Sequence, residues 1–170
     1  MNDYKWYPVY TRSRMEKKVY QELRQKEIIA YLPLKKELKQ WSDRKKIVEE
    51  PLIKSYLFVY ITVAQQMEVL QIYGVARFIY FCGKVASMPD KQMEDLKLLL
   101  ATDDELEIFD FDIAEGEKVL IKAGPFKDIV GEVVSIKNKI RVVLRLKNMG
   151  YAININTSMA FLELLNDTVN

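Results

Sequence analysis

The stretch that decides the fold is Pro51-Leu52-Ile53-Lys54-Ser55-Tyr56-Leu57-Phe58-Val59-Tyr60-Ile61. From Tyr56 onward the residues are aromatic or β-branched at almost every position, which is typical of a buried strand rather than of a helix. Because side chains alternate along a strand, Leu57, Val59 and Ile61 share one aliphatic face. The opposite face carries a row of three aromatic residues: Tyr56, Phe58 and Tyr60.

This aromatic row has two interpretations. It is either a second core layer that a helix covers, or a surface that binds a partner. Aromatic side chains are usually buried, so the residues alone favour the core layer. The rest of the chain is needed to decide between the two.

Length and composition indicate a globular protein. The chain has 170 residues, of which 49% are hydrophobic and 29% charged, and this fits one medium domain or two small ones. No apolar run approaches the roughly 20 residues that a membrane helix needs, and the first residues show no signal-peptide pattern. With Cys82 as the one cysteine, no internal disulfide can form. We therefore expect a cytoplasmic protein that does not enter a membrane.

The chain contains no histidine. This removes the commonest metal ligand, the usual general base and every Ser-His or Cys-His nucleophile. The best candidate carboxylates for an enzyme, Asp103-Asp104 and Asp110 with Asp112, offer no metal-ligand pattern. The sequence therefore predicts a binding protein rather than an enzyme, without a metal or another cofactor.

Charge is distributed unevenly along the chain. Residues 1–101 hold 18 basic and 12 acidic residues, residues 102–114 hold six acidic residues and no basic one, and residues 115–170 hold eight basic and six acidic ones. The near-neutral total of +2 thus hides a basic first part. This asymmetry suggests a polyanionic partner for the first part.

The first part begins with a strand and a helix. Trp6–Thr11 is rich in β-forming residues, although Pro8 belongs at an edge or a bulge. Ser13 and Glu16 have the spacing of a capping box, so we expect the helix to begin near Ser13. Its apolar stripe recurs every four residues: Met15, Val19 and Leu23.

The opposite side of this helix is basic. It and the residues just before it carry Arg12, Arg14, Lys17, Lys18 and Arg24. An ordinary solvated face is one explanation. The other is a face that contacts nucleic-acid phosphates, and Arg12 and Arg14 beside the helix start strengthen it.

Further elements complete an α+β domain over residues 1–101. We expect a strand over Ala30–Leu38 and a basic hairpin tip over Lys39–Ile47 with an isolated Trp41. After the central strand we expect a helix over Thr62–Tyr73 with Val63, Met67 and Leu70 on one face, a strand over Val75–Cys82, and a helix after Pro89. The order β-α-β-β-α-β-α predicts an antiparallel sheet flanked by helices.

The last part has a different pattern. Residues 102–114 form an acidic linker, for which a solvated tether is favoured over a segment that folds back on the basic domain. Residues 115–170 contain five short predicted strands: Lys118–Lys122, Gly131–Lys137, Ile140–Leu146, Tyr151–Ile155 and Ala160–Leu164. Five short strands in about fifty residues predict a small SH3-like β-barrel.

Four stretches, in this order, resemble the NusG family of transcription elongation factors. They are Trp6-Tyr7, Glu50 through Val59, Gly74 through Gly83 followed by Pro89-Asp90, and the KOW-like series Gly116-Glu117-Lys118-Val119, Gly124-Pro125-Phe126 and Gly131-Glu132-Val133. The resemblance runs from about Trp6 to Leu164. The Glu50-Pro51-Leu52 lead-in is similar to specialised paralogues, RfaH and the UpxY antiterminators. Lys54-Ser55 departs from the family, which usually has proline before the signature tyrosine.

The resemblance implies a docking role for the first domain. In the family this domain holds the clamp helices of RNA polymerase in a hydrophobic depression. By position, Tyr56, Phe58, Phe81 and Met93 would line it, and the resemblance therefore favours the partner surface over the core layer for the aromatic row. The basic residues Arg12, Arg14, Lys17, Lys18 and Arg24 would lie toward upstream DNA or the non-template strand. Holding the clamp would suppress pausing or termination without any bond chemistry.

The resemblance also implies a second partner for the KOW domain, either the termination factor Rho or ribosomal protein S10. By position, Phe126 and Met149 would contact it, although Phe126 could equally fill the barrel interior. Some paralogues carry a helical form of this domain, but the β-prone Arg141–Leu146 predicts a barrel. We expect a monomer. The alternative function is a ribosome-associated KOW protein that binds RNA, which the greater basicity of the first domain disfavours.

Overall fold

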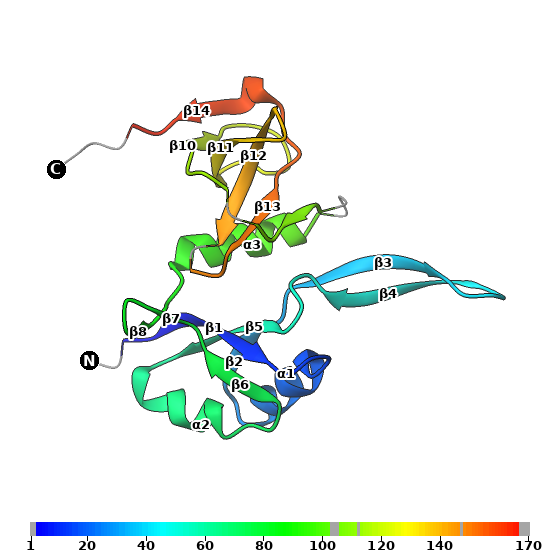
Figure 1. Cartoon of the computed structure of the whole chain (residues 1–170), viewed down its shortest axis with the longest axis vertical. Helices are drawn as coiled ribbons and strands as arrows, with labels where there is room; N and C mark the ends of the chain where they lie inside the picture. The colour runs from blue at the N-terminus through cyan, green and yellow to red at the C-terminus, as the bar shows by residue number, and fades with distance from the viewer. Residues whose placement is uncertain (1–2, 103–105, 112, 147, 167–170) are drawn as a thin grey trace. The chain divides into compact units, whose positions relative to one another are not determined.

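The computed structural model describes residues 3–102, 106–111, 113–146 and 148–166 (Figure 1). Contacts divide the chain into an N-terminal unit, Met1–Asp90, and a C-terminal unit, Lys91–Asn170. The division falls at the start of the third helix, whereas the sequence predicts that this helix closes the first domain at residue 101. Each unit is described by itself.

A four-stranded antiparallel sheet is the centre of the N-terminal unit. Its strands are β1 (Lys5–Thr11), β2 (Ile29–Tyr31), β5 (Tyr56–Ile61) and β6 (Val75–Phe78), in the order β2-β5-β1-β6. Two helices accompany it: α1 (Glu16–Gln25) and α2 (Gln66–Leu70) (Figure 1). The predicted antiparallel sheet with flanking helices is therefore confirmed.

The aliphatic face of β5 forms the core of this unit. Leu57, Val59 and Ile61 are fully buried and share one cluster with Val19 and Leu23 of α1. Val69 and Ile72, in and just after α2, belong to the same cluster. Burying an aliphatic side chain of this size stabilises a fold by about 1.5–3 kcal/mol. The predicted division of β5 into an aliphatic core face and an aromatic face is thus confirmed.

Pro8 is accommodated by a gap in the sheet. It pairs with Phe58 on one side of β1. On the other side, β6 pairs only with Val9–Thr11, and the isolated bridge to Met88 is at Trp6. Pro8 lies between these two stretches, where a missing N–H interrupts no described pairing with β6.

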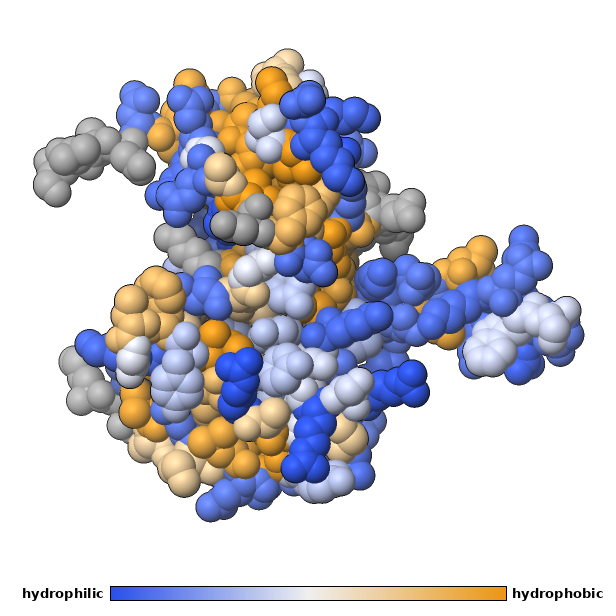
Figure 2. All heavy atoms as spheres, viewed as in Figure 1, coloured by the Kyte–Doolittle hydropathy of each residue, from blue (hydrophilic) through white to orange (hydrophobic). Residues whose placement is uncertain are grey.

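Strands β3 (Leu34–Gln40) and β4 (Lys45–Pro51) form a separate two-stranded hairpin. Figure 1 shows it as an arm that extends from the four-stranded sheet, and Figure 2 shows it largely hydrophilic with a few hydrophobic residues. The Trp41 N–H donates to the Arg44 carbonyl at 2.8 Å and closes the turn. The single predicted strand Ala30–Leu38 is wrong, because Pro33 separates β2 from β3 and leaves the arm free of the sheet.

Two helix predictions also need correction. Helix α1 begins at Glu16, not near Ser13, and its N-cap residue Met15 makes no side-chain capping bond. The second helix begins with a 3-10 turn, Val63–Gln65, before α2. Val63 and Met67 are exposed, whereas Leu70 packs against the core cluster, so the three residues do not form one common core-facing stripe.

The predicted strand Val75–Cys82 is likewise divided. Its first half is β6, and its second half is β7 (Tyr80–Phe81), which pairs with β8 (Lys84–Val85) in a small hairpin. Cys82 and Gly83 form the turn of this hairpin with positive φ angles of 49° and 74°. The division places the side chains of Tyr80 and Phe81 in solvent, where both are about 60% exposed (61% and 59%).

The C-terminal unit contains α3 (Asp90–Leu100) except for its first residue, Asp90, which belongs to the N-terminal unit. It also contains a six-stranded antiparallel sheet. The strands are β9 (Ile108–Phe109), β10 (Glu117–Ile121), β11 (Val130–Ile136), β12 (Lys139–Leu146), β13 (Tyr151–Asn154) and β14 (Leu162–Leu164), in the order β14-β10-β11-β12-β13-β9. A 3-10 turn, Met159–Phe161, precedes β14. All five predicted strands are present with small shifts at their ends, so the β form of this domain is confirmed.

Strand β9 shows that part of the acidic linker belongs to this sheet. Ile108 and Phe109 pair with Ile153 and Ala152 of β13, and the Asn154 N–H donates to the Glu107 carbonyl at 2.8 Å. Phe109 is 6% exposed and joins the core cluster of this unit. The expectation of a solvated tether is therefore wrong for Ile108–Phe109, because two apolar residues in an acidic segment complete a sheet edge.

Within the described ranges, no helix has the length and apolar character to cross a membrane.

Candidate functional site

The aromatic face of the N-terminal sheet is built across β1 and β5. Their antiparallel register places Tyr10 opposite Tyr56 and Trp6 opposite Tyr60. The Tyr10 and Tyr56 rings meet edge to face at 5.1 Å, and those of Trp6 and Tyr60 lie 5.2 Å apart. Such pairs contribute about 0.5–1.5 kcal/mol each beyond their buried area, so the face is held in a fixed shape.

The four predicted docking residues are in different settings. Tyr56 is half-buried and Phe58 is fully buried, both on the aromatic face of β5. Phe81 is in the same unit but exposed on the β7–β8 hairpin. Met93 lies in α3 of the C-terminal unit and is 1% exposed. Tyr56 and Phe58 are therefore the two predicted residues that lie together on one face. Phe81 is the predicted residue whose side chain is largely accessible.

A strained turn fixes where β5 begins. Ser55 has a left-handed backbone, with φ at 65°, in the place where the family usually has proline. Its N–H donates to Oε1 of Glu16 at 2.7 Å, and its carbonyl accepts from the Thr11 N–H at 2.8 Å. Glu16 is 6% exposed, so its carboxylate serves this turn instead of capping α1. The start of the aromatic row is thereby tied to both α1 and β1.

A second surface combines cations with an exposed aromatic ring. The Arg12 guanidinium and the Lys18 ammonium both lie over the Tyr73 ring, at 5.5 Å and 5.4 Å from its centroid. Tyr73 is 62% exposed. Contacts of this kind are worth about 0.5–1 kcal/mol each at exposed sites. They hold two of the predicted nucleic-acid-binding residues side by side. We call Arg12, Lys18 and Tyr73 the Tyr73 cluster.

The other predicted basic residues are distributed more widely. Arg14 is exposed with φ at 62°, and Arg24 is exposed in the last turn of α1. Lys17 donates from Nζ to the Glu49 carbonyl at 2.6 Å, so it binds the base of the arm. Sequence reasoning missed Tyr73, which the sequence places only at the end of a predicted helix.

Arg77 was missed as well. It lies over the Tyr10 ring at 5.2 Å from the centroid and joins the basic surface to the aromatic face. The one signal in the sequence that could have found it is a charged residue within the otherwise apolar stretch Val75–Phe78.

The two predicted partner-binding residues of the KOW region are both buried. Phe126 is 1% exposed, which agrees with a role in filling the interior, and Met149 is 8% exposed. The accessible aromatic side chains of this unit that the structure describes are Phe111 and Phe161, at 47% and 38% exposure. Neither was selected from the sequence.

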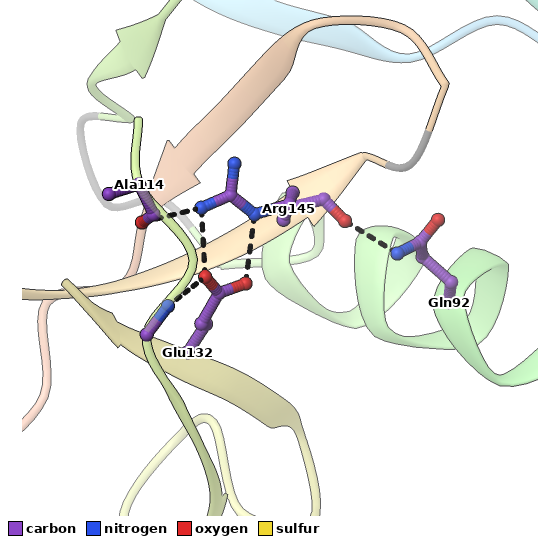
Figure 3. Close-up of polar contacts among 5 residues, drawn as sticks. Gln92, Ala114, Glu132 and Arg145 are labelled. Carbon is purple, nitrogen blue, oxygen red and sulfur yellow. Dashed lines mark hydrogen bonds and ion pairs between the residues drawn. The ribbon is translucent and has the colours of Figure 1, made fainter. Parts of the chain in front are cut away.

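An ion pair joins the chain after β9 to the middle of the C-terminal sheet (Figure 3). Nε and Nη2 of Arg145 donate to the two carboxylate oxygens of Glu132 at 2.9 and 2.8 Å. Glu132 also accepts the Gly116 N–H at 2.7 Å, and Arg145 donates to the Ala114 carbonyl at 3.2 Å. Burial acts to raise the pKa of Glu132, but the hydrogen bonds from Arg145 and Gly116 outweigh it and leave the pKa lowered.

Helix α3 contacts the sheet of its own unit through polar side chains. Lys91 donates to the Asp128 carbonyl at 2.7 Å, and Gln92 donates to the Arg145 carbonyl (Figure 3). The buried carboxylate of Asp95, 2% exposed, accepts the Val130 N–H at 3.3 Å and pairs with Lys91. These bonds explain why contacts assign α3 to the C-terminal unit.

No group of three His, Cys, Asp or Glu side chains that could hold a metal ion is found among the described residues. The surfaces above consist of aromatic rings, cations and backbone groups. This chemistry suits binding of a partner rather than bond rearrangement.

Comparison with known proteins gave one family and one group of structures. The family model described as "Transcription termination factor nusG" matches residues 4–97, more than half of the chain. No curated protein matches. Among the solved structures that match is one on the domain interaction in Thermotoga maritima NusG. It shares 20% identity over 95% of this chain and 97% of that chain, with a TM-score of 0.53. At this identity the likeness supports the fold alone.

Proposed function

Because the chain belongs to the NusG family of transcription factors, we propose that it is an elongation or antitermination factor that binds the clamp helices of RNA polymerase. It performs no bond chemistry. By bridging the polymerase cleft it would favour the closed clamp and so reduce pausing or termination.

The observation that carries this proposal is the two-sided N-terminal sheet. The helices α1 and α2 both contribute to the aliphatic cluster on one face of β5. The aromatic face thus receives no helix from its own unit, and Phe81 is exposed on a hairpin of the same unit. Exposed and half-buried aromatic side chains are the commonest anchors of protein interfaces. This arrangement supports docking through Tyr56 and Phe81, the two accessible members of the proposed set, whereas Phe58 and Met93, also proposed from the family, are buried in this structure.

The basic surface supports a second contact, with upstream DNA or the non-template strand. Arg12, Arg14, Lys17, Lys18 and Arg24 are the proposed residues, and Tyr73 is added by the structure. Lysine and arginine attract phosphates without regard to sequence, whereas an exposed ring can stack on a base. The C-terminal unit is the proposed binding site for Rho or ribosomal protein S10, through the loops that hold Phe126 and Met149.

The remaining expectations follow from the family. The chain would act in the cytoplasm as a monomer, with a NusG-like domain over residues 1–101, a linker over 102–114 and a KOW domain over 115–170. The hydrogen bonds of α3 favour an alternative division, in which α3 and β9 belong to the KOW domain.

A single-round transcription assay tests the proposal. RNA polymerase halted upstream of a known pause is released with and without the purified full chain, and the pause lifetime is measured. We expect the wild-type chain to shorten the pause and Phe81→Ser to lose this effect. Phe161→Ser, an exposed aromatic residue of the C-terminal unit, is the matched control and should retain it. A wild-type chain that leaves elongation unchanged at saturating concentration contradicts the proposal.

A further inference from the structure

The C-terminal unit contains a hollow that the proposed function does not use. It has a volume of about 330 Å³ and lies between the β9 segment and the turn that joins β11 to β12. Ligand sites in proteins begin at about this size. Neither Phe126 nor Met149 lines it, so it is separate from the surface proposed for Rho or S10.

One wall of the hollow is basic. Lys137, Lys139 and Arg141 line it, together with a single carboxylate, Glu107. Arg141 donates to the Glu107 carboxylate at 3.0 Å, and the charges of these two side chains offset each other. Across the parts of the chain that the structure describes, the two lysines have no ion-pair partner. Both are exposed, so among the residues that line the hollow two positive charges lack an ion-pair partner, which favours an anion even beside the exposed Asp110.

A tight turn determines the position of these lysines. Lys137 and Asn138 both have positive φ angles, 49° and 63°, as in the two-residue hairpin turns that match the twist of the strands. Ile136 pairs with Lys139 on either side of the turn. The ammonium groups are consequently attached to a fixed hairpin rather than to a long loop.

The other wall is aromatic. Phe109 is buried, whereas Phe111 is 47% exposed, and their rings meet edge to face at 5.7 Å and 65°. Phe109 therefore holds Phe111 by contact with one part of the ring and leaves the remainder open to the hollow. A ring held in this way is suited to stacking on a flat partner, and base stacking on aromatic residues contributes about 1–3 kcal/mol.

We propose that this hollow binds a nucleotide unit, with its base against Phe111 and its phosphate near Lys137 and Lys139. The combination of an anion site and an open ring within one hollow selects a ligand that has both a charge and a flat apolar part. A free mononucleotide and a residue of single-stranded RNA share this chemistry. Bases inside a duplex are stacked on each other and would not reach Phe111. The site is independent of the proposed contact with polymerase.

The experiment is amide chemical-shift mapping of the ¹⁵N-labelled full chain by NMR, with three probes in parallel: inorganic phosphate, AMP and a six-residue oligoadenylate. We expect AMP and the oligonucleotide to shift the amides of residues 107–111 and 136–141. Saturation by AMP at low concentration identifies a free nucleotide as the ligand, and saturation by the oligonucleotide alone identifies RNA. Equal shifts with phosphate alone indicate an adventitious ion only and overturn the proposal, as does the absence of shifts in both segments.

Variants separate the two walls of the site. Phe111→Leu should weaken binding of the nucleotide by at least about fivefold while leaving the phosphate response unchanged, because stacking is lost but the charges remain. Lys137→Gln with Lys139→Gln should remove the response to all three probes. Lys127→Gln, an exposed lysine outside the hollow, is the control and should behave as wild type. Shifts that persist in both test variants place the ligand elsewhere and contradict the proposal.

Discussion

At the scale of single residues, a few polar contacts determine where the functional surfaces are placed. Glu16 is buried in α1, yet its carboxylate accepts the N–H of Ser55, a residue 39 positions later with a left-handed backbone. A non-glycine residue in this conformation needs support from its surroundings. The sequence offered Glu16 as a capping residue, and only the fold could show that it supports the start of the aromatic row.

Replacing Glu16 tests this contact. Glu16→Ala leaves the buried Ser55 N–H without its acceptor, which costs about 1–3 kcal/mol in the free energy of unfolding. Trp6 and Trp41 are the two tryptophans of the chain, and both lie in the N-terminal unit. Urea unfolding followed by tryptophan fluorescence therefore reports this unit. Glu16→Gln keeps an acceptor oxygen, so its free energy of unfolding should fall by less. Equal decreases in both variants would show that the bond to Ser55 is not the cause.

The Glu132–Arg145 pair predicts a pH dependence of the C-terminal unit. The pKa of Glu132 is lowered in the folded chain from its usual 4.5, so folding favours its ionised form. Its contribution is complete above the unfolded pKa and is lost as the pH falls through the lower folded pKa. We expect the amide signals of β12 to lose protection against exchange below about pH 4.5. Glu132→Gln should lower the stability of this unit at neutral pH and reduce the dependence of its stability on acid. An unchanged acid dependence would rule out Glu132 as the source.

At the scale of elements, the sequence predicted which strands and helices are present better than it predicted where they begin and end. The strands β1 and β5, helix α3 and all five strands of the KOW region could be predicted, because alternation, apolar stripes and turn residues agree there. The failures have two causes, which are local changes of the backbone at Pro33 and Val63–Gln65 and a tertiary contact at Phe109. Pro33 detaches the arm, a 3-10 turn rotates the face of α2, and Phe109 brings an acidic segment into a sheet. None of these is visible in local periodicity.

The role of β9 as a part of the sheet predicts a stability effect. Phe109 is 6% exposed within the core cluster of the C-terminal unit, so Phe109→Ala should destabilise that unit by about 3 kcal/mol. The neighbouring ring of Phe111 is half exposed, and Phe111→Ala is the matched control with a smaller expected loss. Thermal unfolding observed through the β13 amide signals measures both. Equal stability of Phe109→Ala and wild type would mean that residues 106–111 act only as a tether.

Gly116 shows why the KOW-like glycines are needed at particular positions. A Cβ built on Gly116 would lie 1.7 Å from the carbonyl oxygen of Val133, and backbone cannot yield by that distance. Gly116→Ala should therefore disrupt the β10–β11 pairing and unfold the C-terminal unit, as judged by loss of the dispersed β12 amide signals. Gly150→Asn is the control, since a Cβ at Gly150 meets no atom within 4 Å and asparagine tolerates its φ of 75°. Retention of native signals by Gly116→Ala would contradict the described geometry.

At the scale of the whole molecule, the uneven charge predicts a polyanionic partner for the first part of the chain but does not give the site that binds it. The excess of basic residues lies in residues 1–101. Two of them, Arg12 and Lys18, contact the ring of Tyr73. The family could be predicted from the four quoted stretches. Which aromatic side chains are accessible could not, because Phe58, Phe126 and Met149 are buried, while Phe81, Phe111 and Tyr73 are exposed through turns that the sequence does not specify.

The Tyr73 cluster predicts a salt dependence for nucleic-acid binding. Each cation that neutralises a phosphate of single-stranded DNA contributes about 0.7 to the slope of log affinity against log salt. Arg12→Ala with Lys18→Ala should thus reduce this slope by about 1.4 in fluorescence anisotropy titrations. Lys84→Ala, an exposed lysine on β8, should leave the slope unchanged. A double variant with the wild-type slope would exclude Arg12 and Lys18 from the contact.

The most direct test of the central claim is the affinity of the purified full chain for the isolated clamp-helix region of RNA polymerase, compared with Phe81→Ser. Phe81 is exposed, so the fold should persist, and tryptophan-monitored unfolding verifies this. We predict at least a tenfold loss of affinity, as for an aromatic interface anchor. The control Phe161→Ser should bind as wild type. Full affinity of a correctly folded Phe81→Ser chain would contradict docking through this aromatic surface.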